Sequence, residues 1–464
     1  MTMNSSKQYT RVYFIGIGGI GMSALARIFH KQGLDVSGYD LTPSRITEAL
    51  QVEGISVHFE DRGEELAGEN FTPEDTVVVY TPAVPDSLGE LIYFREHGFN
   101  VIKRSEALAL ALSGYKQAAV AGSHGKTTTS TMLAHIMHNS HKGCFAVLGG
   151  ISVNTGTNVI IEEDAEWAVT EADEYDHSFL KLSPQIAIVT SISPDHLDIY
   201  HTAEGYHKGF LEFIQRIDHS GALIYKKGVL APSELPECTS YSYCINSEAD
   251  IYSDGIRIED EELLFDWHFP AMGIHMERVI LATPIEVNVE NATAAMGAAV
   301  LAGVTPDELR AALLSFKGVK RRFEVILHDD RYVLIDDYAH HPEEIAAAAA
   351  SLKRLFPNDR VMAIFQPHLY TRTRDFYKGF AHSLDAFDEV VLLPIYPARE
   401  EPIEGVTSQL IYDELTIPNK YMVDKDRLVG FIGQHASLPR VIVTVGAGNI
   451  DRLVMPLAKK LRSM

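Results

Sequence analysis

The chain has 464 residues, 46% of them hydrophobic and 22% charged, and at about 150 residues per domain this length predicts roughly three domains. Lys and Arg number 40 against 63 Asp and Glu, so the formal net charge is −23. This charge argues against proteins that coat nucleic acid or an anionic membrane surface, because either needs a basic face. It does not exclude phosphate ligands, since a few amides and one lysine can bind a phosphate inside an acidic protein.

Cysteine usage and the N-terminus predict a cytoplasmic protein. The three cysteines, Cys144, Cys238 and Cys244, do not form a paired framework, which favours a reducing compartment. Met1 to Thr10 is polar and lacks the apolar core of a signal peptide. No apolar run reaches the ~20 residues of a membrane span. We therefore expect no membrane insertion, no nucleic-acid partner, and a monomer or homodimer.

Alternating short β-rich runs and helical patterns predict a parallel α/β sheet in the first unit, residues 1–113. A strand from Arg11 to Ile15 runs directly into a glycine-rich turn, and a helical pattern follows the turn. Two further predicted strands, with the residues that follow them, are Asp35–Tyr39 with Asp40 and Val77–Tyr80 with Thr81, Pro82 and Ala83.

The glycine-rich turn matches the G-x-G-x-x-G pattern at Gly16, Gly18 and Gly21. Such glycines permit a tight turn and let a diphosphate approach the helix N-terminus, and Asp40 has a spacing suited to a ribose hydroxyl. Taken alone, the pattern indicates an NAD or FAD site. The plainer alternative is a turn that only packs the helix on the strand. We expect a diphosphate-containing ligand, whose identity the motif leaves open.

A phosphate-binding loop opens the second predicted unit, residues 114–323. The strand Gln117 to Val120 runs into Ala121-Gly-Ser-His-Gly-Lys-Thr-Thr-Thr129, and a helix follows. Glycines let N–H groups converge on phosphate, Lys126 would reach the β and γ oxygens, and the Thr127 hydroxyl can bind Mg²⁺. Simple capping of the helix is the alternative. The strand before the loop and the helix after it favour ATP binding.

Two further strand ends in this unit carry candidate metal ligands. Glu171 ends a buried strand, where a carboxylate is costly without a partner, and Mg²⁺ beside Thr127 would be that partner. His196 follows the strand Ile186 to Thr190, at the sheet edge where α/β proteins bind ligands. The acidic residues after Glu171 are either part of a site or a solvated loop, and for Glu174 we expect the solvated loop.

The stretch from about Tyr241 to Val289 is hairpin-rich, and we expect it to extend the edge of the second sheet. A helix carrying Asn288 and Asn291 follows, and Gly318 to Phe323 forms a hinge into the third unit, residues 324–464. The predicted strands of the third unit are Tyr332–Ile335, Val361–Phe365, Glu389–Leu393 and Val441–Val445.

Polar groups also follow the strands of the third unit. The segment from Asp336 to Pro342, which includes Asp337, Tyr338 and His340, brings two carboxylates, an aromatic ring and two imidazoles to one strand end. This combination indicates a site, although acids also favour helix N-termini. Arg372 follows the next strand and could hold a carboxylate in a bidentate fork. Arg322 in the hinge could instead meet a phosphate.

Together these motifs resemble the Mur ligase family over almost the whole chain. The resemblance implies an α/β protein of three domains: an N-terminal Rossmann-like domain for the UDP substrate, a central P-loop ATPase-like domain with a β-rich edge, and a C-terminal Rossmann-like domain for the amino acid. The matching segments are GIGGIGMSALA (Gly16–Ala26), AGSHGKTTT (Ala121–Thr129), EADEYDHSFL (Glu171–Leu180), SPDHLDIY (Ser193–Tyr200), NVEN (Asn288–Asn291), RRFE (Arg321–Glu324), DDYAHHPEE (Asp336–Glu344), QPHLYTRTRDF (Gln366–Phe376) and GAGNI (Gly446–Ile450).

The resemblance implies a reaction in peptidoglycan precursor synthesis. The members most similar to this chain use ATP and Mg²⁺ to join L-alanine to the lactyl carboxylate of UDP-N-acetylmuramate through an acyl phosphate, and they release ADP and phosphate. A recycling ligase that attaches a tripeptide to the same UDP sugar is an alternative. An NAD(P)-dependent oxidoreductase is another, although hydride transfer has no use for the loop at Lys126. A non-catalytic nucleotide sensor is the third.

The resemblance also implies roles for individual residues. Lys126, Glu171, His196, Arg322, Asp337 and His340 would be catalytic, and Thr127, Glu171 and His196 would bind the metal. The UDP substrate would lie on Gly16, Gly18, Gly19, Gly21, Asp40, Thr81, Pro82 and Ala83, and the amino acid beside His340 and Arg372. The implied ATP site is Gly122, Ser123, His124, Gly125, Lys126, Thr127, Thr128, Asn288, Asn291, Arg322, Asp337 and Tyr338.

Overall fold

The computed structural model describes residues 9–464 apart from 70, 82, 163, 195–196, 260–261, 284 and 399. Two predicted site residues, Pro82 and His196, therefore lie outside the described residues. The chain divides into two compact units: unit 1 is Met1–Thr283 with Val287–Lys317, and unit 2 is Pro284–Glu286 with Gly318–Met464.

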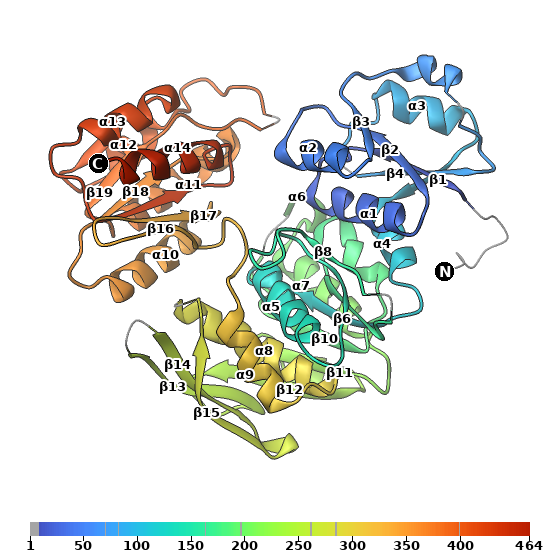
Figure 1. Cartoon of the computed structure of the whole chain (residues 1–464), viewed down its shortest axis with the longest axis horizontal. Coiled ribbons are helices and arrows are strands. Elements are labelled where there is room, and N and C mark those ends of the chain that lie inside the picture. The colour runs from blue at the N-terminus through green and yellow to red at the C-terminus, as the bar shows by residue number, and fades with distance from the viewer. Residues whose placement is uncertain are drawn as a thin grey trace. The chain divides into compact units, whose positions relative to one another are not determined.

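A five-stranded parallel sheet forms the first part of unit 1 (Figure 1). Its order is β3 (Ser56–His58), β2 (Asp35–Tyr39), β1 (Arg11–Ile15), β4 (Thr76–Tyr80), β5 (Asn100–Lys103). Val12 and Phe14 of β1 face one core, while Tyr13 and Ile15 face the other. Because both faces are buried, the strand reads as a continuous apolar run. The helices are α1 (Ile20–Lys31), α2 (Arg45–Val52), α3 (Gly89–Glu96) and α4 (Arg104–Ala111).

A ten-stranded sheet forms the second part of unit 1. Its order is β15 (Ile274–Leu281), β14 (Glu262–Phe269), β13 (Ile251–Glu259), β12 (Thr239–Ile245), β11 (Ala222–Lys226), β10 (Ile186–Val189), β6 (Lys116–Ala121), β9 (Trp167–Glu171), β7 (Phe145–Val147), β8 (Val159–Ile160). Val120 of β6 faces the core under α5, and Ala119 faces the opposite core under α7. The helices are α5 (Lys126–His138), α6 (Leu197–Tyr200), α7 (Ala203–Ile214), α8 (Glu286–Leu301) and α9 (Pro306–Ser315).

The edge of this sheet confirms the prediction for the hairpin-rich stretch. Strands β13, β14 and β15 pair in antiparallel hairpins at one end of the sheet, whereas β12 pairs in parallel with β11 and β13. These strands are drawn in yellow-green in Figure 1. The chain then returns through α8 and α9, and α9 begins where Thr305 and Glu308 form a capping box around Pro306.

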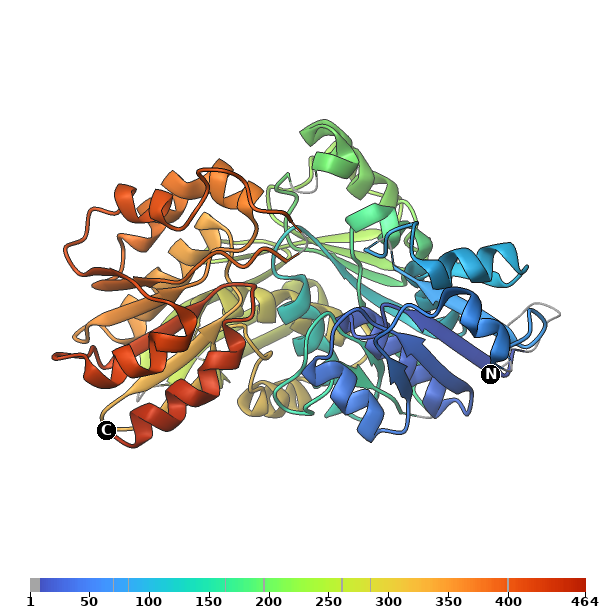
Figure 2. The ribbon, with the colours of Figure 1, turned by 90° about the horizontal axis from the view of Figure 1, so that it is seen from above.

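A six-stranded sheet forms unit 2, and Figure 2 shows helices on both of its faces in orange and red. Its order is β16 (Glu324–His328), β17 (Val333–Asp337), β21 (Val441–Val445), β18 (Val361–Phe365), β19 (Glu389–Leu392), β20 (Lys420–Met422). Only β16 is antiparallel to its neighbour. The helices are α10 (Pro342–Leu355), α11 (Tyr370–Leu384), α12 (Gln409–Glu414), α13 (Leu428–Gln434) and α14 (Asp451–Arg462).

The observed sheets confirm the predicted α/β class and most of the predicted strands. The predicted bounds of Arg11–Ile15, Asp35–Tyr39, Val361–Phe365 and Val441–Val445 are those observed. The three cysteines are buried free thiols. None of the helices in the described ranges has both the length and the apolar character that crossing a bilayer requires. The domain boundaries near residues 113 and 323 stay a prediction.

Candidate active site

The phosphate-binding loop follows β6, whose neighbours in the sheet are β9 and β10. Gly122 has a φ of 140° and Gly125 a φ of 83°, values that glycine adopts far more readily than other residues. A Cβ on Gly122 would lie 2.0 Å from Thr190 Oγ1, and one on Gly125 would lie 3.0 Å from Asn291 Oδ1. The loop therefore needs glycine at both positions, because its backbone lies tightly against its neighbours.

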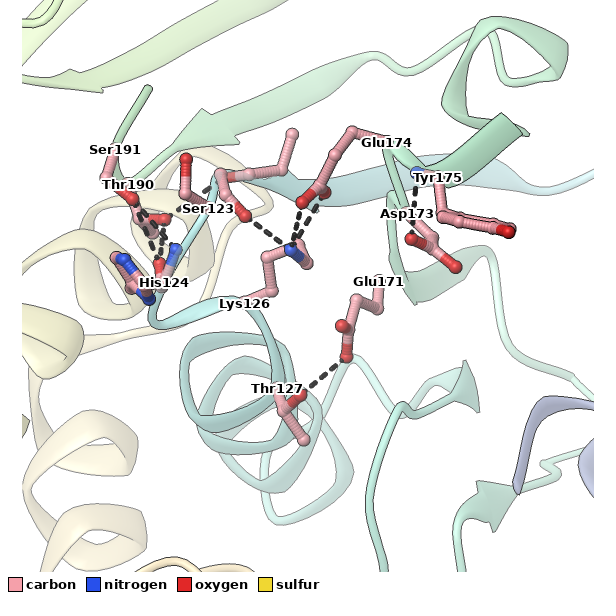
Figure 3. A network of polar contacts seen from close by, with 12 residues as sticks. Ser123, His124, Lys126, Thr127, Glu171, Asp173, Glu174, Tyr175, Thr190 and Ser191 are labelled. Atoms are coloured by element: carbon pink, nitrogen blue, oxygen red, sulfur yellow. Dashed lines mark hydrogen bonds and ion pairs between the residues drawn. The ribbon is translucent and has the colours of Figure 1, made fainter. Parts of the chain in front are cut away.

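Lys126 begins α5 and turns its ammonium back over the loop (Figure 3). Nζ donates to the Gly122 carbonyl oxygen at 2.5 Å and lies 2.9 Å from Oε1 and 2.8 Å from Oε2 of Glu174. Burial alone would lower the pKa of Lys126, but the charges of Glu174 and Glu171 together raise it above its ordinary value. The lysine therefore remains a cation, as phosphate binding requires.

Glu174 corrects a prediction from the sequence, which placed it in a solvated loop. Its side chain is only 1% exposed. The Tyr206 hydroxyl donates to Glu174 Oε1 at 3.3 Å, and the Tyr200 hydroxyl donates to the Glu174 carbonyl oxygen at 2.6 Å. The prediction was wrong because the cation that pairs with this carboxylate, Lys126, is 48 residues away in the sequence.

The two described residues of the predicted metal site meet in the fold. The Thr127 hydroxyl donates to Glu171 Oε2 at 2.9 Å (Figure 3). A hydroxyl and a carboxylate suit Mg²⁺, which fills its remaining positions with water and phosphate oxygens. Within the described ranges no three His, Cys, Asp or Glu side chains gather into a metal-binding group. The third predicted ligand, His196, lies outside those ranges.

The remaining unit 1 residues of the predicted ATP site line or support the loop. The Ser123 hydroxyl donates to the Ser193 carbonyl oxygen at 2.6 Å. Asn291 accepts from the Thr129 hydroxyl at 3.1 Å and donates to Asn288 at 3.2 Å, and both asparagines are buried in α8. The predicted residues found in or beside the loop are Gly122, Ser123, His124, Gly125, Lys126, Thr127, Thr128, Asn288 and Asn291.

The glycine-rich turn of the first sheet lies where β1 and β4 end side by side. Gly16 has a φ of 86°, and a Cβ on it would lie 3.2 Å from Thr81 Cγ2. This is the place where the strand order reverses, at which open α/β sheets bind ligands. Asp40 Oδ2 accepts the Gly18 N–H at 2.7 Å, so this carboxylate binds the turn itself. The predicted residues described here are Gly16, Gly18, Gly19, Gly21, Asp40, Thr81 and Ala83.

A basic residue that the sequence prediction missed lies beside this turn. A Cβ on Gly21 would lie 2.9 Å from Arg104 Nη1, so the guanidinium lies against the first turn of α1. Arg104 Nη2 donates to Asp173 Oδ2 at 2.9 Å, and Lys103 Nζ donates to Asp176 at 2.7 Å. Cations are unfavourable at a helix N-terminus unless anions lie close. The feature of the sequence that could have indicated Arg104 is its position, with Lys103, directly at the end of β5.

In unit 2 a second cluster gathers where β17 and its neighbour β21 end. Asp336 is 2% exposed; it accepts from the Thr444 hydroxyl at 2.6 Å and from Arg321 Nε at 3.3 Å. Burial raises the pKa of Asp337 to about 7, although the Ala339 N–H donates to its Oδ1. The structure therefore distinguishes two adjacent carboxyl groups: among the residues it describes, Asp336 pairs with the Arg321 guanidinium, and no such pair is found for Asp337.

The other predicted residues of unit 2 lie around the Tyr338 ring. The Arg321 and Arg322 guanidinium carbons lie 5.0 and 5.1 Å from the ring centroid. His340 Nδ1 donates to the Tyr338 carbonyl oxygen at 3.0 Å, and its ring centroid is 6.4 Å from that of His368. The fold therefore brings the predicted Arg322, Tyr338 and His340 together.

Arg372 lies in the first turn of α11, close enough to influence two imidazoles. Burial lowers the pKa of His340, and it lowers that of His368 to about 4, with the Arg372 charge acting in the same direction. Gln366 Oε1 and His368 Nδ1 are buried, and among the described residues neither has a hydrogen-bond partner. Such atoms call for an explanation, and a ligand is one. The sequence prediction missed both residues.

Comparison with known proteins decides the family. Three family models match successive parts of the chain: "Mur ligase family, catalytic domain" at residues 11–116, "Mur ligase middle domain" at 120–299 and "Mur ligase, glutamate ligase domain" at 321–448. A UDP-N-acetylmuramate--L-alanine ligase of Porphyromonas gingivalis is 50% identical over 456 residues, which are 98% of this chain and 99% of that protein. The chain belongs to the Mur ligase family.

Other relatives of this Mur ligase support the same family assignment. A protein of the same name from Parabacteroides distasonis is 49% identical over 97% of both chains. Among solved structures, the UDP-N-acetylmuramate-alanine ligase of Thermotoga maritima has a TM-score of 0.82 at 27% identity and covers 98% of this Mur ligase and 99% of that chain. A murein peptide ligase from Psychrobacter arcticus, with a TM-score of 0.71 at 22% identity over 98% and 99% of the two chains, shares the fold.

Proposed function

We propose that this chain is an ATP-dependent ligase that joins L-alanine to the lactyl carboxylate of UDP-N-acetylmuramate and releases ADP and phosphate. The observation that carries the proposal is the charged Lys126 over a glycine loop, with Thr127 and Glu171 paired at 2.9 Å beside it. The substrates come from the name shared by relatives that are about half identical over nearly the whole chain.

The residues of the loop act on the phosphates of ATP. The carboxylate of the acceptor is a poor acylating group, so the γ-phosphoryl group is first transferred to it, giving an acyl phosphate. Lys126 offsets the negative charge that spreads over the transferring group, and loop N–H groups hold the phosphates in line. When bound by Thr127, Glu171 and His196, Mg²⁺ would neutralise further phosphate charge. Arg322, Asp337 and Tyr338 keep their implied roles at the ATP as part of this proposal.

The UDP substrate is proposed to bind at the glycine-rich turn of the first sheet. Its diphosphate needs positive charge in a protein whose formal net charge is −23. The α1 N-terminus supplies amide N–H groups, and Arg104 beside Gly21 adds a guanidinium that can bind phosphate in a bidentate manner. We propose that Asp40, which accepts a hydrogen bond from the Gly18 N–H, lies near the nucleoside.

The amino acid is proposed to bind in unit 2 beside His340 and Arg372. A guanidinium matches the carboxylate of L-alanine. Gln366 Oε1, an acceptor without a hydrogen-bond partner in the described part of the chain, suits its amine. The amine of L-alanine then attacks the acyl phosphate and displaces phosphate, and for this it must lose a proton. His340, whose lowered pKa keeps it neutral near pH 7, and Asp337, whose pKa is about 7, are the candidate bases.

Phosphate release tests the proposal directly. Purified protein would be given ATP, Mg²⁺ and UDP-N-acetylmuramate, with L-alanine, glycine, L-serine and the tripeptide offered separately. We expect release with L-alanine and a ligated product of the corresponding mass. Release only with the tripeptide would favour the recycling ligase instead, and release with none would leave the nucleotide sensor.

Three further parts of the proposal concern the whole protein. We propose the domains 1–113, 114–323 and 324–464, with the UDP substrate, ATP and the amino acid assigned to them in that order. The unpaired cysteines agree with a cytoplasmic location. The oligomeric state stays a prediction, monomer or homodimer, which light scattering of the purified protein would decide.

A further inference from the structure

Glu174 is a buried carboxylate that faces the phosphate-binding loop, and the resemblance assigned it no role. Both of its oxygens lie within 2.9 Å of Lys126 Nζ, as Figure 3 shows, and its side chain is 1% exposed. The same ammonium donates to the Gly122 carbonyl oxygen at 2.5 Å. Two fixed acceptors on different strand ends therefore determine where the positive charge lies.

The carboxylate is itself held from a second side. Tyr206, which is fully buried, donates from its hydroxyl to Glu174 Oε1 at 3.3 Å and lies 3.0 Å from the Ser123 hydroxyl of the loop. Its ring packs against Tyr200 at 5.0 Å, and the Tyr200 hydroxyl donates to the Glu174 carbonyl oxygen at 2.6 Å. Residues of α6 and α7 thus fix the glutamate, and through it the lysine.

Fixing a lysine matters for phosphoryl transfer. A free lysine side chain samples many rotamers, and this conformational freedom must be lost when the ammonium is placed against a phosphate. Charge that is already oriented toward the transition state costs no reorganisation at the moment of reaction. A carboxylate that only competed with phosphate for the ammonium would instead weaken ATP binding and leave the rate of turnover unchanged.

We propose that Glu174 is a positioning residue: it holds the Lys126 ammonium over the loop so that the cation is in place when the phosphoryl group is transferred. The inference rests on the proposed function for the reaction that it serves. It places Glu174 behind Lys126, without contact between Glu174 and the substrates.

The test separates binding of ATP from turnover in four variants. ATP affinity would be measured by calorimetry without acceptor, and kcat and KM by phosphate release with whichever acceptor the wild type uses. In Glu174→Gln we expect kcat to fall about ten- to a hundredfold, while the Kd for ATP stays within about threefold of wild type or tightens. Glu174→Asp should recover part of kcat, and Tyr206→Phe should lower kcat about two- to fivefold. Glu166→Gln, which alters an exposed pair with Lys116 next to the opposite end of β9, is the control and should match wild type.

Several results would overturn the inference. A folded Glu174→Gln variant with wild-type kcat would do so, and so would one whose Kd for ATP weakens as much as its kcat falls. If Glu174→Gln does not fold, a folded Tyr206→Phe variant with wild-type kcat overturns it equally. A wild-type protein that turns over only with the tripeptide contradicts the proposed function and leaves this test intact.

Discussion

Lys126 and Glu174 form a buried pair at the phosphate-binding loop, and each offsets the charge of the other. Burying a single ion is costly, and removing one partner of such a pair leaves an uncompensated charge. The exposed pairs of this protein, such as Lys116 with Glu166, have much less to lose, because water screens them. The stability that is lost when a charged residue is replaced therefore depends on how deeply its ion pair is buried.

Lys126→Met should strongly lower turnover, whereas the exposed Lys116→Met should leave it unchanged. Lys116 is the first residue of β6, and Lys126 follows the loop after the carboxyl end of the same strand. Loss of the Lys126 cation should lower kcat about a hundredfold or more and lower stability by about 3–5 kcal/mol. Phosphate release and chemical denaturation would measure the two effects, and a Lys126→Met protein with full activity would refute the proposed ATP site.

Asp337→Asn should change how stability depends on pH. Burial raises the pKa of Asp337 from 3.8 to about 7, with Glu344 and Asp336 acting in the same direction and Arg322 opposing. Between about pH 4 and pH 7 the folded protein therefore keeps a proton that the unfolded chain releases, so wild-type stability falls as pH rises through this window. The asparagine variant should lack that fall, and its Tm relative to wild type should rise with pH.

Asp329→Asn is the control for this measurement. Backbone N–H groups of Tyr332 and Arg331 lower the pKa of Asp329, so its ionised form stabilises the fold. The Tm of Asp329→Asn relative to wild type should therefore fall as pH rises through the acid range, which is the opposite trend. Parallel trends in the two variants would contradict the account of Asp337.

At the scale of elements, one arrangement recurs in all three sheets. The glycine-rich turn follows β1, the phosphate-binding loop follows β6, and Asp337 ends β17. In each case neighbouring parallel strands end at the same edge, so short loops from separate parts of the sequence meet there. The glycine positions then decide how closely those loops can approach one another.

Gly122→Ala should disrupt the loop, whereas Gly228→Ala should be tolerated better. Both glycines have a positive φ, 140° and 92°. A Cβ at residue 122 would lie 2.0 Å from Thr190 Oγ1, but nothing lies within 4 Å of a Cβ at residue 228. We expect about 1–3 kcal/mol lost from backbone strain in each, and an additional loss of ATP binding only at residue 122. Thermal unfolding and calorimetry would measure both, and equal ATP binding would contradict the argument.

Several of the strands that the sequence predicted with their observed bounds are buried. β1 and β18 are apolar on both faces and end in marked turns, so local pattern alone located them. β3 and β20 were not predicted, because each has three residues, lies at a sheet edge and has little apolar signal. In the site, Gly122 and Lys126 belong to a local motif and were predicted. Glu174 and Arg104 depend on partners distant in the sequence and were not.

At the scale of the whole molecule, the formal net charge of −23 does not describe the sites. Lys126 lies among Glu171 and Glu174, and Arg104 and Lys103 pair with Asp173 and Asp176. Each of these cations therefore lies beside an acid, and the local pairs rather than the total charge decide what a ligand meets there. Dissolved salt screens exposed charges that lie more than about 10 Å apart, so an anionic substrate senses mainly the charges beside it.

A fragment of residues 318–464 should fold by itself. Its sheet has one core on each face, and apart from Ile285 the buried residues of both cores lie within this range. A domain with its own core can fold alone. We expect cooperative thermal unfolding by circular dichroism and a dispersed NMR spectrum. Non-cooperative melting would show that this unit depends on the rest of the chain.

The sequence by itself determined the α/β class, the succession of sheets along the chain, the two glycine motifs and the family resemblance. Each of these is encoded in local spacing and hydrophobic pattern. The tertiary structure alone decided which charges are paired, that Glu174 is buried beneath Lys126, that Asp40 caps its own turn, and that Arg104 lies against α1. Electrostatic energy depends on distance and burial in space, and residues far apart in the chain acquire both only when it folds.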